Sequence, residues 1–370
     1  MTGWTNQLNE VRSPGQARAG GWTKTALTLV MLALWAVFLA WAQANLDDYK
    51  LRILNLSAIN IILGVSLNLI YGFTGMFSLG HAGFMAVGAY VAALLTMPVA
   101  QKEMMFLMTP LIWPFNSVQW PFLPALLIAG LVSALFGLLI GLPVLRLRGD
   151  YLGIATLGFA EIIRVVANNL QSITNGALGL KGIPAYANLW WTWGWAIFTV
   201  FVIRRLVTSS YGRALMAIRE NEIAAETMGV RLAYHKVLSF VTGAFFAGIG
   251  GGLLGSLVTT IDPKTFNFLL TFNIMLIIVV GGLGSITGTM VASVLYTVLL
   301  EVLRPIEAPI ALGPIHIPGI PGMRMVVFSL LLMFVIIFYQ QGLFGRREFS
   351  WDWLFGRFGR GRFRQEGRAR

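Results

Sequence analysis

Residues 122–145 read FLPALLIAGLVSALFGLLIGLPVL, a run without a single charged side chain. A helix needs about 20 consecutive apolar residues to cross the hydrocarbon core of a bilayer, and this run has that length. The whole 370-residue chain shares the bias, with 57% hydrophobic and 11% charged residues. A soluble domain carries about a quarter charged residues. The composition therefore excludes an ordinary soluble enzyme and predicts an all-α polytopic membrane protein.

Apolar runs of similar length recur along the chain and predict about ten transmembrane helices. We place them at 25–44, 53–71, 77–97, 122–145, 151–168, 189–206, 237–258, 268–284, 286–303 and 323–341. Only a glycine-rich stretch separates 268–284 from 286–303, which is compatible with a tight hairpin between these two helices. Glycines at 248, 252, 251, 255, 284 and 288 give the small-x-x-x-small spacing that lets helices pack closely.

The distribution of Lys and Arg residues orients these helices. With the N-terminus inside, the N-terminal segment, the turn at 146–148, the loop 204–236 and the tail after 345 are cytoplasmic, and they hold most of the basic residues. The opposite side receives Lys50, Arg52, Lys102, Lys181, Lys264, Arg304 and Arg324. We therefore expect both the N-terminus and the C-terminus to be cytoplasmic.

Three parts follow from this topology: a cytoplasmic segment 1–24, a transmembrane domain 25–345 and a basic, aromatic cytoplasmic tail 346–370. Ala42-Gln43-Ala44 resembles a signal-peptidase site, but the preceding run exceeds the usual 7–15-residue signal core, so we expect a retained anchor. The tail alternates Arg with Trp, Phe and Gly, which suits anionic lipid headgroups better than nucleic acid. A disordered tail without function is the alternative.

Several kinds of chemistry have no basis in this sequence. The chain has no cysteine, so disulfides and thiolate metal sites are excluded. No G-x-x-x-x-G-K-[ST] run is present to hold ATP phosphates, and no H-E-x-x-H or G-x-S-x-G motif occurs. We therefore expect a protein that is not an enzyme and that binds no cofactor or metal itself.

Ionisable side chains in a bilayer are costly unless they pair or face water, so those in the predicted helices are candidate sites. Glu161 and Arg164 lie on one helix face, and Asn168 continues that face one turn later. These three either line a translocation pathway or form an internal ion pair that fixes one helix against a neighbour. His81, in the small and polar stretch 77–83, either lines a cavity or bonds a backbone carbonyl.

Asn60, Gly64 and Asn68 recur at four-residue spacing and so share a second helix face. This spacing favours a closely packed helix interface that is bonded through the two amides over contact with a substrate.

The cytoplasmic loop at about 207–236 includes YGRALMAIRENEIAAETMGVRLAYHK at residues 211–236. Residues 214–220 and 222–228 are strong helix formers, with Asn221 as a cap between them and Gly229 as the end of the second helix. We expect Ile223, Met228 and Val230 to hold this second helix against the membrane face. The opposite face, with Glu222 and Glu226, is then free to dock on a soluble partner.

This loop resembles the coupling loop of ABC importer permeases, whose signature is Glu-Ala-Ala, three residues, then Gly. Ala224, Ala225 and Gly229 match that spacing, while Ile223 replaces the Glu. The local form GRALMAIRENEIAAETMGV is similar to the branched-chain amino-acid subgroup. Further blocks resemble its LivM-type subunit in the same order: FTGMFSLGHAGFMAVGAY at 73–90, GDYLGIATLGFAEIIRVVANN at 149–169, NGALGLKGIP at 175–184, FNFLLTFNIMLIIVVGGLGSITG at 266–288 and YQQGLFG at 339–345.

The resemblance implies a permease subunit of a bacterial or archaeal inner membrane with no ATPase of its own. Such subunits pair with a second, homologous permease, two cytoplasmic ATPases that use ATP and Mg²⁺, and an external solute-binding protein. The coupling positions that it implies here are Arg219, Glu222, Ala224, Ala225 and Gly229. Branched-chain amino acids are the expected substrate, with urea, amides or other organic acids as alternatives.

A different class of protein also fits the polar residues in the predicted helices. A self-sufficient ion-coupled carrier would use Glu161 as a proton or sodium site. Such carriers are typically built from inverted repeats with broken helices at the midplane, and no convincing repeat is visible in this sequence.

Overall fold

The computed structural model describes residues 21–106, 109–147, 149–307, 310–312, 315–317, 322–338, 342–345 and 348. The chain divides into two units, residues 1–46 with 349–370 and residues 47–348. The segment before Gly21, and the predicted basic tail apart from Glu348, lie outside the described residues. In the first unit, helix α2 spans Gly21–Asn45 and covers the first predicted membrane run.

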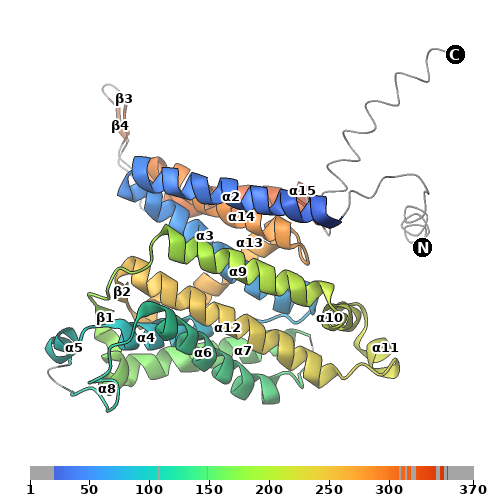
Figure 1. The fold of residues 1–370 in the computed structure, drawn as a ribbon, viewed down its shortest axis with the longest axis horizontal. Coiled ribbons are helices and arrows are strands. Elements are labelled where there is room, and N and C mark those ends of the chain that lie inside the picture. Colours follow the sequence, from blue (N-terminus) through green and yellow to red (C-terminus); the bar gives the residue numbers. More distant parts are fainter. Residues whose placement is uncertain are drawn as a thin grey trace. The chain divides into compact units, whose positions relative to one another are not determined.

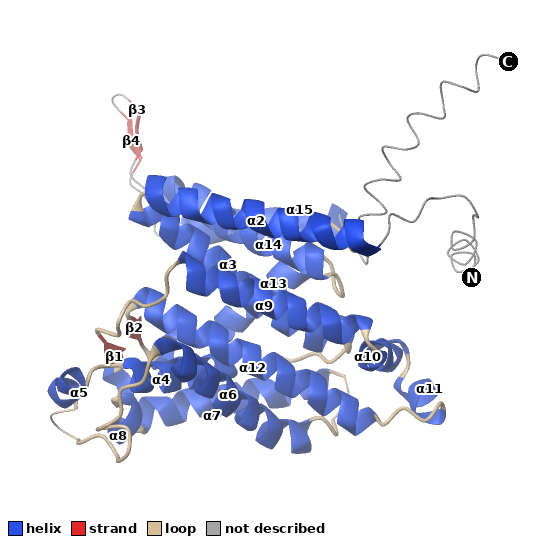
Figure 2. Ribbon diagram, in the orientation of Figure 1, coloured by secondary structure: helices blue, strands red, loops and turns tan. Residues whose placement is uncertain are grey.

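The second unit is a bundle of helices (Figures 1 and 2). Its longer helices each cover one predicted run: α3 (Asp48–Asn68) with the π-helix η1 (Leu69–Phe73), α4 (His81–Thr96), α6 (Phe122–Val144), α7 (Asp150–Asn169), α9 (Leu189–Thr208), α12 (Leu232–Val258), α13 (Phe268–Gly281), α14 (Ile286–Val302) and α15 (Met323–Phe338). Helices α13 and α14 form the tight hairpin that the sequence suggested.

Short elements connect these helices. The short helices are α5 (Val99–Met105), α8 (Gln171–Thr174), α10 (Ser210–Glu220), α11 (Glu222–Thr227), η2 (Gly176–Leu178), η3 (Pro263–Thr265) and η4 (Arg304–Glu307). Strand β1 (Leu180–Lys181) pairs antiparallel with β2 (Thr260–Ile261), and β3 (Ile310–Leu312) pairs antiparallel with β4 (Ile315–Ile317). The protein is therefore helical, with two minor strand pairs in its connections.

The number of membrane crossings stays a prediction. By length and composition, five described helical segments could cross a bilayer: Ala26–Asn45, Asp48–Phe73, Phe122–Val144, Leu232–Val258 and Pro263–Gly281. A sixth results if α4 and α5, which are bent by 117°, form one broken span. Helix α7 carries charged residues in its middle, and α14 and α15 have only 17 and 16 residues. The cytoplasmic position of both termini is likewise untested by the structure.

Helix α12 lies at the centre of the second unit and packs against α3, α4 and α6. Close approach to α4 depends on glycine: a Cβ on Gly88 would lie 2.2 Å from the carbonyl oxygen of Gly248, and one on Gly251 would lie 2.1 Å from that of Met85. Side chains are thus excluded where the two backbones meet. This confirms the packing role predicted for the glycine-rich run in α12.

Hydrogen bonds join α3 to α14 along their length. Asn60 Nδ2 donates to Thr297 Oγ1 at 2.9 Å, and Asn68 Nδ2 donates to Thr289 Oγ1 at 2.8 Å. Between them, a Cβ on Gly64 would lie 2.9 Å from the Cγ2 atom of Thr289. The closely packed, amide-bonded face predicted from the four-residue spacing is confirmed.

The contact between α4 and α12 can be tested by adding one methyl group. Gly88→Ala must push the two helices apart, so we expect it to lower the free energy of unfolding by about 1–3 kcal/mol. Gly194→Ala in α9 is the matched control, since nothing outside its own helix lies within 4 Å of the added Cβ. The control should be neutral or slightly stabilising. Denaturant unfolding in detergent measures both, and equal stabilities would contradict this packing.

Candidate coupling loop and translocation pathway

The loop after α9 forms the two helices that the sequence predicts. Helix α10 ends at Glu220, and the side-chain oxygen of Asn221 accepts a hydrogen bond from the amide of Ala224 at 3.0 Å, which caps α11. Gly229 has a φ of +84°, a conformation that favours glycine, and its amide bonds the carbonyl of Glu226 at 2.9 Å. The predicted cap and helix end are confirmed.

Two kinds of contact fix the inner side of this loop. Leu215 and Ile218 of α10 and Ala225 of α11 are buried. In addition, the Nζ of Lys236 in α12 donates to a carboxylate oxygen of Glu222 at 2.5 Å, with the lysine side chain only 6% exposed. Glu222 therefore faces the protein and not a docking partner, which differs from the expected arrangement.

The outer side of α11 carries two exposed apolar side chains beside the exposed carboxylate of Glu226, which is free as the sequence analysis expected. Ile223 is 65% exposed and Met228 is 84% exposed, so neither side chain packs against the rest of the chain, and their expected contact with the membrane face stays a prediction. The reason for this exposure is geometric: α11 has six residues, and positions 222 and 225, three apart, already occupy its inner face. Residue 223 is turned away from that face, and its side chain becomes available for contact from outside.

Arg219 connects the loop to the end of α3. Its Nη1 donates to the carbonyl oxygen of Gly72 at 2.7 Å, and its Nη2 lies 2.9 Å from a carboxylate oxygen of Glu220. The side chain is 19% exposed. Sequence reasoning included Arg219 in the loop but gave no signal for the contact with Gly72, which lies far away along the chain.

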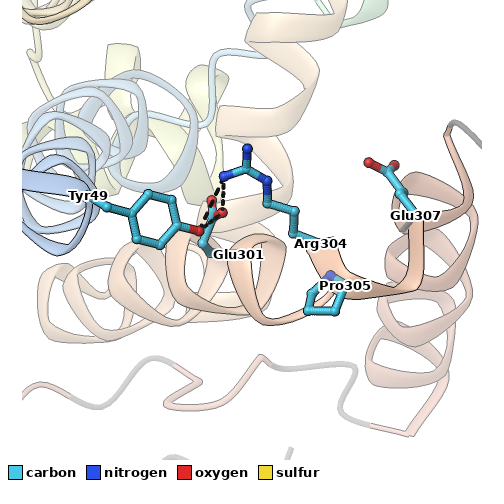
Figure 3. Close-up of a pocket in the computed structure, with 5 residues that line it drawn as sticks. All are labelled: Tyr49, Glu301, Arg304, Pro305 and Glu307. Carbon is cyan, nitrogen blue, oxygen red and sulfur yellow. Dashed lines mark hydrogen bonds and ion pairs between the residues drawn. The ribbon is translucent and has the colours of Figure 1, made fainter. Parts of the chain in front are cut away.

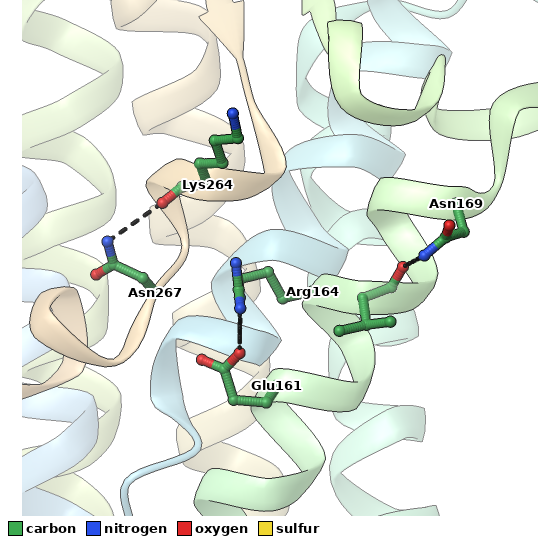
Figure 4. A network of polar contacts seen from close by, with 6 residues as sticks. Glu161, Arg164, Asn169, Lys264 and Asn267 are labelled. Atoms are coloured by element: carbon green, nitrogen blue, oxygen red, sulfur yellow. Dashed lines mark hydrogen bonds and ion pairs between the residues drawn. The ribbon is translucent and has the colours of Figure 1, made fainter.

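Helix α7 carries three of the predicted pathway residues. Arg164 Nε donates to Glu161 Oε2 at 2.7 Å, and the two side chains are 35% and 37% exposed (Figure 4). Asn168 is half-buried on the same face. The η3 turn, which sequence reasoning missed, also packs against α7, and in it Asn267 Nδ2 donates to the carbonyl oxygen of Lys264 at 3.2 Å. The structure thus brings Glu161, Arg164 and Asn168 to one partly open face of α7.

His81 lies elsewhere, in the protein interior. It is 1% exposed, and its Nε2 is 3.0 Å from the hydroxyl of Ser66 on α3. Helix α4 does pack against α7, since a Cβ on Gly83 would lie 3.0 Å from the Cα of Ala160. The imidazole nevertheless contacts α3, so the structure does not bring His81 together with Glu161 and Arg164.

A pocket lies at the far end of α14, lined by Tyr49, Glu301, Arg304, Pro305 and Glu307 (Figure 3). Tyr49 donates its hydroxyl proton to Glu301, and Arg304 Nη1 donates to the same carboxylate at 3.0 Å. The Arg304 guanidinium also lies 5.6 Å from the centre of the Tyr49 ring. These charges neutralise one another. Within the described residues, no group of three or more His, Cys, Asp or Glu residues could hold a metal ion.

The family follows from comparison with known proteins. The model of the branched-chain amino acid transport system permease component matches residues 49–338, and this chain belongs to that family. It is a multi-pass membrane permease of the LivM type. No solved structure matches the chain.

The similar proteins include both LivM and LivH permeases. The chain is 34% identical over 310 residues to the high-affinity branched-chain amino acid transport system permease protein LivM of Salmonella typhimurium. The matched segment covers 75% of this chain and 68% of that protein. Identity to LivM of Escherichia coli is 34% over 319 residues, or 77% and 70% of the two chains. Identity to LivH of Escherichia coli is 25% over 253 residues, or 63% and 78%.

The ion pair beneath α11 can be tested by removing its carboxylate. Glu222→Ala leaves the buried ammonium of Lys236 without its counter-ion, so α11 should open more easily by about 1–2 kcal/mol, a cost reduced by the partial exposure of Glu222. Hydrogen exchange at the amides of 224–228 should accelerate about tenfold. Glu226→Ala, at an exposed position of the same helix, is the control. Equal exchange in both variants would show that the pair does not hold the helix.

Proposed function

We propose that this chain is one membrane subunit of an ATP-driven importer that carries leucine, isoleucine and valine into the cell. Its partners are a second permease related to LivH, two cytoplasmic ATPases that hydrolyse ATP with Mg²⁺, and an external binding protein that delivers the amino acid. The complex lies in the inner membrane of a bacterium or archaeon, with both termini of this chain in the cytoplasm. The chain itself hydrolyses no ATP.

One observation carries this proposal: the loop between α9 and α12 is fixed on its inner side and presents two exposed apolar side chains on its outer side. Ala225 and the pair of Glu222 with Lys236 hold α11 to the protein, while Ile223 and Met228 point outward. A short helix with an exposed apolar face suits a groove on a soluble partner. An ATPase that closes around this helix would move it as a rigid piece.

The coupling positions divide into two groups in this proposal. Ala224 is exposed and lies on the surface offered to the ATPase. Arg219, Glu222 and Ala225 hold the two helices to the membrane unit, and Gly229 ends α11 so that the chain can turn into α12. Closure of the ATPases would thereby reach the membrane helices as a displacement of the whole loop.

The pathway runs along the partly open face of α7. Glu161, Arg164 and Asn168 are ionisable or amide groups in the middle of an apolar helix, and such groups belong beside water or protein. The second permease would cover this face and complete the walls of the pathway. His81 is buried in the single chain and would join the pathway only in a state in which α3 and α4 separate.

Transport by reconstituted proteins tests the whole proposal. Proteoliposomes with both permeases and the ATPases should take up radiolabelled leucine when ATP is inside and loaded binding protein is outside. The purified single chain should transport nothing, because half of the pathway walls are then missing. Uptake by the complex should not depend on a pH gradient, either with the original chain or with Glu161→Gln. Uptake by the single chain that loses its pH-gradient dependence in this variant would instead establish an ion-coupled carrier.

The docking surface can be tested separately. Ile223→Asp combined with Met228→Asp puts two charges into an apolar contact, so we expect the ATPases to bind about tenfold or more weakly. Met104→Asp is the control, since Met104 is 73% exposed and lies on α5, far from the loop in the predicted topology. Co-purification of the ATPases with each variant gives the result. Equal recovery from all variants would rule out docking through these two side chains.

A further inference from the structure

The guanidinium of Arg219 lies where three segments meet: the end of α10, the π-helix η1 and the turn between α13 and α14. Its Nη1 bonds the carbonyl of Gly72 at 2.7 Å. Added Cβ atoms show how close the neighbouring backbone comes: on Gly284, in the turn between α13 and α14, the Cβ would lie 2.8 Å from the same Nη1. On Gly75, two residues after η1, it would lie 2.8 Å from the Cγ of Arg219. Arginine supplies a long stem and a planar fork of donors at this position.

The π-helix explains why a donor is needed here. A π-turn releases carbonyl groups from the regular hydrogen-bond pattern of α3, and inside a membrane protein these must find other partners. Leu69 O accepts from the hydroxyls of Thr74 at 2.8 Å and Ser239 at 3.2 Å. Gly72 O accepts from Arg219. The end of α3 is therefore completed by side chains from other segments, one of which is the coupling loop.

Asn68, directly before the π-helix, connects α3 to the same turn. Its side chain is fully buried. Its Oδ1 accepts from the amide of Gly284 at 3.0 Å, and its Nδ2 donates to the carbonyl of Ser285 at 3.0 Å and to the hydroxyl of Thr289 at 2.8 Å. One amide group thus makes three hydrogen bonds to the α13–α14 turn and the first turns of α14.

Backbone contact reinforces these bonds. A Cβ on Gly72 would lie 1.7 Å from the Oδ1 of Asn68 and 2.5 Å from the amide nitrogen of Gly284, so a side chain at position 72 would displace the bond between Asn68 and the turn. From there the contact between α3 and α14 continues through Asn60, whose amide bonds Thr297 at 2.9 Å and whose carbonyl accepts from Ser293 at 3.2 Å. Helices α3 and α14 are consequently bonded together over their whole shared length.

We propose that Arg219 and Asn68 form a joint that makes the coupling loop, α3 and α14 move as one body during transport. Arg219 binds the loop to α3, and Asn68 binds α3 to α14; both are positioning residues. The inference rests on the proposed function and extends it, because it names the helices that respond to the ATPases. Without these hydrogen bonds, movement of the loop would be passed on through the backbone only to α9 and α12, the two helices that it connects.

The first test measures coupling in the reconstituted complex. We expect Arg219→Ala to abolish the rise in ATP hydrolysis on addition of loaded binding protein, and to reduce leucine uptake about tenfold or more, since a charge-assisted hydrogen bond is lost. Arg219→Lys should restore part of the uptake, because an ammonium can still reach one carbonyl. Arg213→Ala is the matched control on α10: Arg213 is exposed and bonds Ser210 within its own helix.

The second test labels only this chain and reports on the joint directly. Because the chain has no cysteine, Ala217→Cys on α10 and Val291→Cys on α14, both at exposed positions, accept spin labels without competing sites. Pulsed electron paramagnetic resonance should give one narrow distance distribution. Arg219→Ala or Asn68→Leu should broaden it, and Arg213→Ala should not. In the intact complex, the distance should be the same with and without bound ATP.

The possible outcomes separate the two proposals. A distribution that stays narrow in Arg219→Ala and Asn68→Leu overturns the joint, even if ATP hydrolysis is uncoupled, because Arg219 would then act at the ATPase surface. A distance that changes on ATP binding also overturns it. A broadened distribution in a chain that recovers no ATPase from membranes supports the joint and rejects the proposed function. Broadening together with lost stimulation supports both.

Discussion

The structure depends on one constraint: polar groups inside a membrane protein must find their hydrogen-bond partners within the protein, because hydrocarbon offers none. Asn68 meets this constraint with three bonds to the α13–α14 turn and the start of α14. Arg219 meets it for a carbonyl that the π-helix of α3 releases. The same bonds that satisfy these groups also connect the cytoplasmic loop to the interior, so stability and transmission of movement share one set of contacts.

Much of this fold could be predicted from the sequence, because local signals agree with the final packing. Apolar runs located the long helices, and the cap at Asn221 and the glycine at 229 marked the ends of the loop helices. The spacing of Asn60 and Asn68 identified a bonded face before any partner was known. Each of these signals lies within a few residues of the feature that it specifies.

What could not be predicted depends on contacts between segments that are distant in the chain. Nothing near Glu222 indicates that Lys236 will neutralise it, and so its carboxylate was expected to face outward. With that side occupied, Ile223 is turned outward instead. The π-helix has no recognisable sequence pattern, so the contact between Arg219 and Gly72 was invisible. Arg219 was placed among the coupling positions only because the loop resembles that of a family, and this resemblance does not indicate which residue Arg219 contacts.

The central claim is that this chain works only as part of an ATP-driven complex. The most direct measurement is affinity purification of the tagged chain from native membranes in mild detergent, with mass spectrometry of the proteins that accompany it. The account predicts recovery of a second, homologous permease together with ATPases that carry a P-loop. Recovery of this chain alone, under conditions in which known membrane complexes stay intact, would contradict it.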